Sequence, residues 1–268
     1  MGDVPPEIIG HYTEEVDEGE RLARGVHRLE LVRVQEVVRR HLPPGRLRVL
    51  DIGGGTGVHA EWLAAAGNAV HVVDPVPRHV EQAGALDGVT SELGDARRLS
   101  AGDASVDVVL LFGPLYHLTE SADRMSALGE TVRVVKPGGL VFVAAVSRFA
   151  SLFDGLAREF LFEPGFPAIV ERDLREGQHR NADRVPHRFT TAYFHHPEEL
   201  RAEISGAGLD VIELVGVEGL AGWLPHLADR WDDEEARELI LHSARVIESE
   251  PSLLGLSAHL LAVASRPS

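Results

Sequence analysis

A glycine-rich turn between an apolar run and a helical segment constrains this chain more than any other feature. Residues 47–57 read LRVLDIGGGTG, with Asp51 ending the apolar run and glycines at positions 53, 54, 55 and 57. Glycine lets the backbone adopt positive φ and lets a ligand approach with no Cβ in the way. A ligand held there lies against the N-terminus of the next helix. The motif therefore predicts a strand, a ligand-binding turn and a helix, in that order.

The sequence alternates between apolar runs and helical patterns up to residue 147. Five runs predict strands, at residues 48–52, 69–74, 92–95, 106–112 and 140–146. Helical patterns lie between them, at residues 58–66, 77–86 and 123–135. Repeated β-α-β units imply a parallel sheet with right-handed crossovers and helices on both faces. We therefore predict a Rossmann-like, doubly wound α/β fold.

Composition and charge exclude several classes of protein. The 268 residues fit one domain, or one domain with a cap. A net charge of −16, with no run of lysines or arginines, argues against a nucleic-acid partner. No apolar run approaches the roughly 20 residues that span a membrane. The chain has no cysteine, and its first ten residues lack the features of a signal peptide. We expect a cytoplasmic protein without a membrane partner.

Two kinds of nucleotide ligand fit a glycine turn of this type. Gly55, Gly57 and Ala60 satisfy the dinucleotide pattern G-x-G-x-x-A. That match starts too late, because Gly53 already occupies the place directly after the strand. The alternative uses acids further along the chain. Asp74 ends the second strand, where a carboxylate accepts hydrogen bonds from ribose hydroxyls, and Asp95 ends the third, where one accepts from an adenine amine.

Together with the glycine turn, these features resemble the class I S-adenosylmethionine-dependent methyltransferases. The resemblance is carried by D-x-G-G-G-x-G, Asp74, the GDA of residues 94–96, VDVVLLFGPLYHL of residues 106–118 and the KPGG of residues 136–139, in that order. It is close over residues 46–146 and looser over the whole chain. It implies a seven-stranded sheet of order 3-2-1-4-5-7-6 with an antiparallel last strand. Further strands expected at residues 209–215 and 254–265 complete that number.

The resemblance also implies how S-adenosylmethionine would be held. Its methionine part would be surrounded by Asp51, Gly53, Gly54, Gly55 and Gly57, and its amine would meet the backbone of Leu111, Phe112 and Gly113. Asp74 would hold the ribose. The adenine would lie near Pro75 or Val76, with its edge read by Asp95 and the backbone of Ala96. Tyr12 or Arg21, in the leading helices, would reach the carboxylate; a solvated helix face is the alternative for these two.

We predict four parts in the chain. Residues 1–45 form an N-terminal helical cover, residues 46–148 the cofactor-binding core and residues 149–195 a cap or substrate insert, with no clear strand over residues 149–193. Residues 196–268 complete the core sheet, with a helix at 197–206 and a helical insertion near 219–250.

The loop after the fourth strand bears on the reaction. It reads FGPLYH over residues 112–117, with no carboxamide or carboxylate before the proline. Methyltransferases of nucleic-acid bases or amides often carry Asn/Asp-Pro-Pro-Tyr/Phe there, so the sequence argues against those substrates. His117, whose side-chain type titrates near pH 6.5, is the candidate general base or substrate-orienting group. Tyr116 beside it is the second candidate catalytic-site residue, as a pocket wall. A packing role is the alternative for His117.

Four residues are candidates for contacting the substrate: Arg148, Tyr193, His195 and Trp223. Arg148 directly follows the fifth strand, and an arginine there can clamp an anionic group. Tyr193 and His195 share one face of an extended segment. Trp223 either lines the pocket or anchors the following helices. No set of ligands has a spacing diagnostic of a metal site.

These observations lead to one function with one alternative. We expect an S-adenosylmethionine-dependent methyltransferase that acts on oxygen or nitrogen of a small molecule, with specialised metabolism as one source of such a substrate. The alternative is a protein that binds the cofactor without transferring the methyl group. The sequence is compatible with a monomer and with a homo-oligomer.

Overall fold

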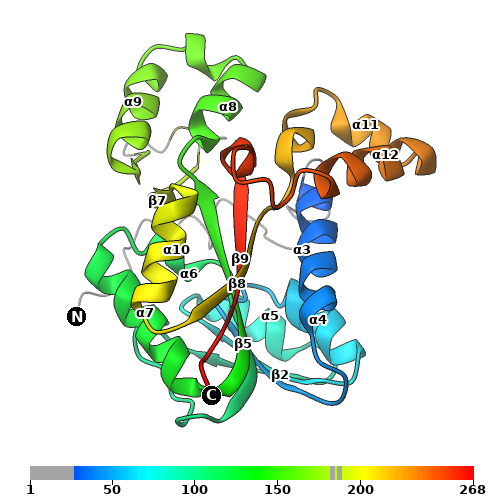
Figure 1. Ribbon diagram of the computed structural model, residues 1–268, viewed down its shortest axis with the longest axis vertical. Coiled ribbons are helices and arrows are strands. Elements are labelled where there is room, and N and C mark those ends of the chain that lie inside the picture. The colour runs from blue at the N-terminus through cyan, green and yellow to red at the C-terminus, as the bar shows by residue number, and fades with distance from the viewer. Residues whose placement is uncertain (1–26, 182–184, 186–188) are drawn as a thin grey trace.

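The computed structural model describes residues 27–181, 185 and 189–268, and it is built around one twisted sheet (Figure 1). Five strands run parallel in the order β3 (Val89–Leu93), β2 (Ala69–Asp74), β1 (Arg48–Ile52), β4 (Val106–Leu111) and β5 (Val135–Ser147). Beyond β5 lie β9 (His259–Ser265) and then β8 (Asp210–Gly216), and β9 is antiparallel to both of its neighbours. The predicted order 3-2-1-4-5-7-6, with an antiparallel last strand, is confirmed by these seven strands.

Two short strands were not predicted and bring the sheet to nine. β6 (Gln178–His179) pairs with β7 (Ala192–His195), and β7 runs parallel to the end of β5 through Val146 and Ser147. The expectation of no strand between residues 149 and 193 was therefore wrong. β6 has two residues and β7 has four, too few to show the alternation by which a strand is recognised in a sequence.

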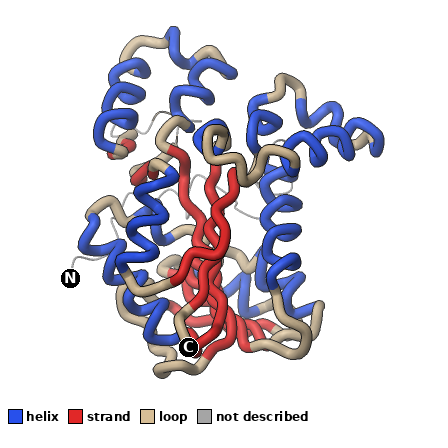
Figure 2. Tube along the Cα trace, in the orientation of Figure 1, coloured by secondary structure: helices blue, strands red, loops and turns tan. Residues whose placement is uncertain are grey.

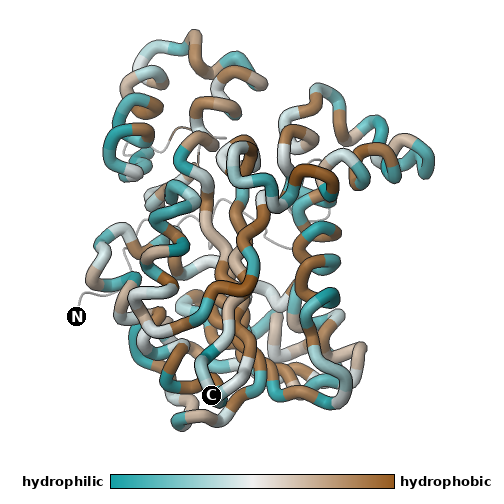
Figure 3. The backbone as a smooth tube through the Cα atoms, in the orientation of Figure 1, coloured by the Kyte–Doolittle hydropathy of each residue, from teal (hydrophilic) through white to brown (hydrophobic). Residues whose placement is uncertain are grey.

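Helices cover both faces of the sheet, as predicted (Figures 1 and 2). One face carries α3 (His27–His41), α4 (Val58–Ala65) and α5 (Pro77–Gly84), whose buried side chains join one core cluster. The other carries α6 (Pro114–His117), α7 (Ser121–Val134) and α10 (Pro197–Gly206), which join a second. Figure 3 shows the hydrophobic residues concentrated on the strands between these two layers. The fold class thus follows from burial on both faces of a parallel sheet.

Two helical lobes lie at the carboxyl end of the parallel strands, at the top of Figure 1. The first lobe contains α8 (Ala150–Ala157), η2 (Phe160–Phe162) and α9 (Phe166–Glu176). The second contains η3 (Gly219–Trp223), α11 (Leu227–Trp231) and α12 (Glu234–Arg245), and η4 (Leu254–Leu256) follows it. The rings of Phe153 and Trp223, 5.8 Å apart, join the two lobes. Ligands of open α/β sheets bind at this carboxyl end, so the lobes stand where a substrate would enter.

Two differences in strand bounds have clear physical causes. The strand expected from residue 254 begins at His259, because residues 254–256 form the 3-10 turn η4. β5 begins at Val135 rather than 140, and an irregular register between the Val106 and Val108 pairs accommodates its early start. No described helix combines the length and apolar character needed to cross a bilayer.

Candidate cofactor and methyl-transfer site

The glycine turn after β1 has a geometry that larger residues could not adopt. Gly53, Gly55 and Gly57 have φ values of 69°, 56° and 88°, in the left-handed region that favours glycine. A Cβ at Gly53 would lie 2.4 Å from Pro114, and one at Gly54 would lie 2.7 Å from the Asp51 carboxyl group. Asp51 therefore packs against one side of the turn, and Pro114, which follows β4, packs against another. A ligand would bind to the backbone on the side away from these two residues.

Asp51 lies beneath this turn as an isolated buried acid. Its side chain is fully buried, and within the described part of the chain neither carboxyl oxygen has a hydrogen-bond partner. Burial, together with the nearby charge of Asp74, raises the pKa of Asp51 to about 7. Burying a carboxylate without a partner is unfavourable unless a positive charge approaches it. The amine and sulfonium of S-adenosylmethionine carry such charge, so this acid fits the cofactor that the sequence predicts.

Asp74 ties the second strand to the glycine turn. Its Oδ2 accepts a hydrogen bond from the backbone N–H of Gly55 at 2.9 Å, and its Oδ1 accepts from the N–H of Val76 at 2.9 Å. His79 Nδ1 lies 3.1 Å from the same Oδ1. A carboxylate has about four acceptor sites, so these contacts leave room for a ribose hydroxyl. Asp74 thus shapes the turn; holding the ribose stays a prediction.

Asp95 pairs with an arginine that the sequence analysis did not single out. Arg97 Nε and Nη2 donate to Asp95 Oδ2 at 3.1 and 2.6 Å, and Arg97 also pairs with Asp123 at 3.2 Å. Burial raises the pKa of Asp95, but the hydrogen bonds from Arg97 outweigh burial and lower it. Ala96 is buried and Pro75 is half-buried. The role of these residues at the adenine edge stays a prediction.

The end of β4 contacts the glycine turn directly. Leu111 is fully buried, and the ring of Phe112 meets His59 of α4 edge-on at 5.0 Å. A Cβ at Gly113 would lie 3.2 Å from the carbonyl oxygen of Gly53. The structure therefore brings together the two loops that were expected to share the methionine part. Two further expected contacts, Tyr12 and Arg21, lie outside the described residues.

His117 and Tyr116 lie on α6, facing the segment that leads into β7. His117 Nδ1 is 3.3 Å from the carbonyl oxygen of Thr191, and its ring stacks on Phe189 with 6.1 Å between centroids. Tyr116 packs against a small apolar cluster that includes Phe194. These contacts join α6 to the segment that leads from β6 into β7. The catalytic roles of His117 and Tyr116 stay predictions.

Arg148, expected to contact substrate, is buried in contacts within the protein. Its Nε donates to the carbonyl oxygen of Phe194 at 2.7 Å, and its Nη2 donates to Tyr193 Oη at 3.2 Å and Glu199 Oε2 at 2.5 Å. The guanidinium thereby fastens β7 and α10 to the end of β5. Contact between Arg148 and a substrate stays a prediction that this burial does not favour.

Tyr193 and His195 also face the interior, beneath α10. Arg124 lies 3.7 Å above the Tyr193 ring. His195 is fully buried with its Nε2 3.2 Å from Glu203 Oε2, and burial lowers the pKa of its imidazole. Burial would raise the pKa of Glu203, yet hydrogen bonds with His195 and Arg124 lower it to about 2. Substrate contact by either residue stays a prediction, and the burial of His195 does not favour it for that residue.

Trp223 occupies the junction of the two lobes. Its Nε1 donates to the carbonyl oxygen of Leu256 at 2.6 Å, and its ring faces Phe153. This arrangement matches the alternative of a hydrophobic anchor, and it also places the indole beside the carboxyl end of the sheet. Its contact with a substrate stays a prediction.

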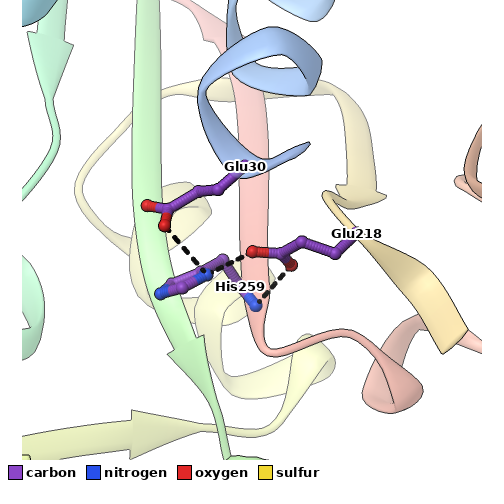
Figure 4. Close-up of side chains that lie close together, drawn as sticks. All are labelled: Glu30, Glu218 and His259. Carbon is purple, nitrogen blue, oxygen red and sulfur yellow. Dashed lines mark hydrogen bonds and ion pairs between the residues drawn. The ribbon is translucent and has the colours of Figure 1, made fainter. Parts of the chain in front are cut away.

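The sequence analysis missed one group of polar side chains at this end of the sheet. Glu30, Glu218 and His259 come from α3, the end of β8 and the start of β9, and one ligand-type atom of each lies within 4.8 Å of the others (Figure 4). Distant positions in a sequence have no diagnostic spacing, so no metal-site pattern revealed them. The one available signal was a histidine at the edge of an apolar strand.

Comparisons with known proteins agree with this geometry. Residues 49–139 match the family described as "Methyltransferase domain". A ubiquinone biosynthesis O-methyltransferase of Azorhizobium caulinodans is 30% identical over 69% of this chain and 70% of its own length. A protein of the same name from Methylocella silvestris is 34% identical over 48% of this chain, a match that spans only 57% of its own length.

Solved structures show the same fold. An S-adenosylmethionine-dependent methyltransferase from Mesorhizobium loti superposes with a TM-score of 0.61 and 18% identity, covering 89% of this chain and all of the other. These findings favour S-adenosylmethionine over a dinucleotide as the ligand of the glycine turn. The chain belongs to the S-adenosylmethionine-dependent methyltransferases of the class I fold, and its cofactor is S-adenosylmethionine.

Proposed function

We propose that this protein transfers the methyl group of S-adenosylmethionine to an oxygen or nitrogen atom of a small molecule. When bound, the cofactor supplies an electrophilic methyl carbon on a sulfonium. The glycine turn and the end of β4 would hold its methionine part, above the negative charge of Asp51. The protein's main task is then to hold the acceptor in line with the methyl carbon and exclude water, which is worth about 7–11 kcal/mol in well-oriented reactions.

The observation that carries this proposal is the position of the two lobes. The lobes follow the carboxyl ends of β5 and β8, as the glycine turn follows the carboxyl end of β1, and Phe153 and Trp223 join the two lobes. A cover of this kind suits a small acceptor. The net charge of −16 disfavours a polynucleotide, and the names of the curated relatives favour oxygen as the atom methylated. We place this reaction in the cytoplasm.

Binding and transfer are tested separately. Isothermal titration calorimetry with S-adenosylmethionine and with NAD measures cofactor choice, and we expect binding of the first alone. The protein is then incubated with methyl-labelled S-adenosylmethionine and a panel of catechols, phenols and small amines, with duplex DNA and tRNA as controls. Transfer to a panel member supports the proposal. Binding without transfer to any of them would favour the alternative, a protein that uses the cofactor as a structural or regulatory ligand.

A further inference from the structure

Glu218, directly after β8, is a buried carboxylate held by hydrogen-bond donors. Only 2% of the residue is exposed. Its Oε2 accepts from Ser257 Oγ at 2.7 Å and from the backbone N–H of His259 at 3.1 Å. Ser257 Oγ itself accepts from the backbone N–H groups of Glu218 and Gly219 at 3.0 and 3.1 Å, so its hydrogen is directed to the carboxylate. The orientation of Glu218 is therefore fixed on both sides.

The second carboxylate oxygen faces the ring of His259 (Figure 4). Glu218 Oε1 lies 2.5 Å from His259 Nδ1. An ionised carboxylate only accepts hydrogen bonds, so the ring proton lies on Nδ1. In a neutral imidazole the lone pair then belongs to Nε2, on the side of the ring away from Glu218. This is how a buried acid orients a histidine that serves as a base.

A second carboxylate, that of Glu30, lies near the same imidazole. Glu30 Oε2, from the first turn of α3, lies 4.0 Å from His259 Nδ1, and His27 Nδ1 lies 3.2 Å from the same Glu30 oxygen. Two carboxylates beside one imidazole stabilise the positive charge that the ring gains when it takes up a proton. The charged and titratable groups facing His259 among the described residues are thus Glu218 and Glu30, with His27 behind Glu30.

His259 also stands at the end of the sheet where the acceptor would lie. It pairs with Val146 near the end of β5, whereas Val143 is already level with Leu111, the last residue of β4. The ring is therefore beyond the end of β4, at the level of the two lobes. A quarter of the side chain is exposed, against 2% for Glu218. The imidazole is therefore partly accessible to solvent, whereas the acid that orients it is buried.

We propose that His259 accepts the proton of the acceptor during methyl transfer, and that Glu218 is the positioning residue that keeps the ring proton on Nδ1. This inference rests on the proposed function. The acceptor's O–H or N–H proton passes to Nε2 as its oxygen or nitrogen bonds to the methyl carbon. The carbon–sulfur bond breaks, and its electron pair stays on sulfur. The imidazolium then returns the proton to solvent.

The same three residues would suit a divalent cation by type, but not by distance. Ligand atoms about 2.1 Å from a tetrahedral zinc ion are more than about 3 Å apart. The short contact between His259 Nδ1 and Glu218 Oε1 instead suits a hydrogen bond. A metal requirement is therefore an outcome that would overturn the proposal.

The test uses Glu218→Gln, His259→Gln and the matched control His226→Gln. His226 also has a carboxylate partner, Asp229 at 3.5 Å, but its side chain is 82% exposed in the second lobe. Nitrogen-15 NMR of the histidine rings reports which nitrogen carries the proton, and the signal missing from His259→Gln identifies His259. We expect the Nδ1–H form in the wild-type protein. In Glu218→Gln the amide would donate to Nδ1, so the ring proton should move to Nε2.

Activity and binding are measured on the same proteins. With an acceptor found in the panel, both variants should lose at least about 100-fold in transfer rate, a typical loss for general acid–base catalysis. The affinity for S-adenosylmethionine should stay within about threefold, and His226→Gln should match the wild type. In the wild-type protein the rate should fall at low pH, where the imidazole is already protonated, and this fall should disappear in His259→Gln. Thermal unfolding shows whether each variant is folded, and if Glu218→Gln is not, Ser257→Ala tests the same orientation more mildly.

Several results would overturn the proposal. These are a wild-type ring protonated on Nε2, a fully active His259→Gln, a loss of cofactor affinity as large as the loss of rate, or activity abolished by EDTA and restored by Mg²⁺, Mn²⁺ or Zn²⁺. A protein that binds the cofactor and methylates no panel member would overturn the proposed function and the base role with it. The ring tautomer would still decide whether Glu218 orients His259.

Discussion

The two halves of the sheet hold their charged groups in different ways. From β1 to β4, the acids lie around a glycine turn and are organised mainly by the backbone, as Asp74 is by the N–H groups of Gly55 and Val76. From the end of β5 onward, charged side chains are buried against one another, as in the pairs of Arg148 with Glu199 and His195 with Glu203. The first half thus places Asp51, which has no hydrogen-bond partner among the described residues, beneath the turn where the ligand is expected. In the second half, charged side chains pair with one another. We call the glycine turn with Asp51 and Asp74 the cradle.

We expect the largest effect on cofactor affinity from a substitution in the glycine turn. Gly53→Ala places a methyl group 2.4 Å from Pro114 at a φ of 69°. Overpacking and left-handed strain together cost up to about 5 kcal/mol, and we expect at least a 100-fold loss of S-adenosylmethionine affinity by calorimetry. Gly67→Ala is the matched control, with a φ of 93° and no atom within 4 Å of its Cβ. Equal behaviour of the two variants would mean that strain alone, rather than the packed cradle, matters.

The raised pKa of Asp51 should make the free energy of unfolding depend on pH. Its pKa is raised to about 7 in the folded protein from 3.8, so the native state binds the proton more tightly than the unfolded state does. This group therefore destabilises the ligand-free protein progressively as pH rises from about 4 to about 7, by an amount of order 4 kcal/mol. Asp51→Asn should have the higher free energy of unfolding at pH 8, with the difference vanishing near pH 4. Denaturant unfolding at both pH values measures it, and parallel curves would contradict the predicted shift.

The variant Asp74→Ala tests whether the acid at the end of β2 contributes to cofactor binding. It removes the acceptor for Gly55 and Val76 and the predicted ribose contact, and we expect cofactor affinity to fall at least tenfold, or about 1.4 kcal/mol. Asp74→Asn keeps one oxygen and should lose less. Unchanged affinity in the alanine variant would rule out the ribose role.

The smallest expected effect concerns α6. His117→Ala removes the contact with Thr191 and the stack on Phe189, and we expect turnover to fall about tenfold, less than for His259→Gln, with cofactor affinity unchanged. Phe189→Leu, which removes only the stacked ring, is the control for packing. Turnover equal to that of the wild type would assign His117 to packing alone.

Prediction from the sequence succeeded where the signal was local and apolar. β2 and α10 have the predicted bounds, because Ala69–Asp74 is a buried apolar run and Pro197 marks a helix start. β3 was misplaced by a few residues, since VTSEL lies at the sheet edge and has no apolar run. The sequence could not show that Arg148 is buried, because the carbonyl oxygen of Phe194 and the carboxylate of Glu199, which it contacts, lie 46 and 51 positions away along the chain.

The sequence by itself determined most of the strands, the glycine turn and the acids at the strand ends, because positive φ, apolar runs and turn residues act over a few neighbouring positions. The strand order came from the resemblance to a known family. Only the tertiary structure decided which polar side chains meet. Glu218 and His259 are 41 positions apart, and their contact exists because β8 and β9 pair antiparallel in the sheet. Burial then favours an arrangement in which both oxygens of Glu218 find donors, and Ser257, the backbone N–H of His259 and its ring supply them.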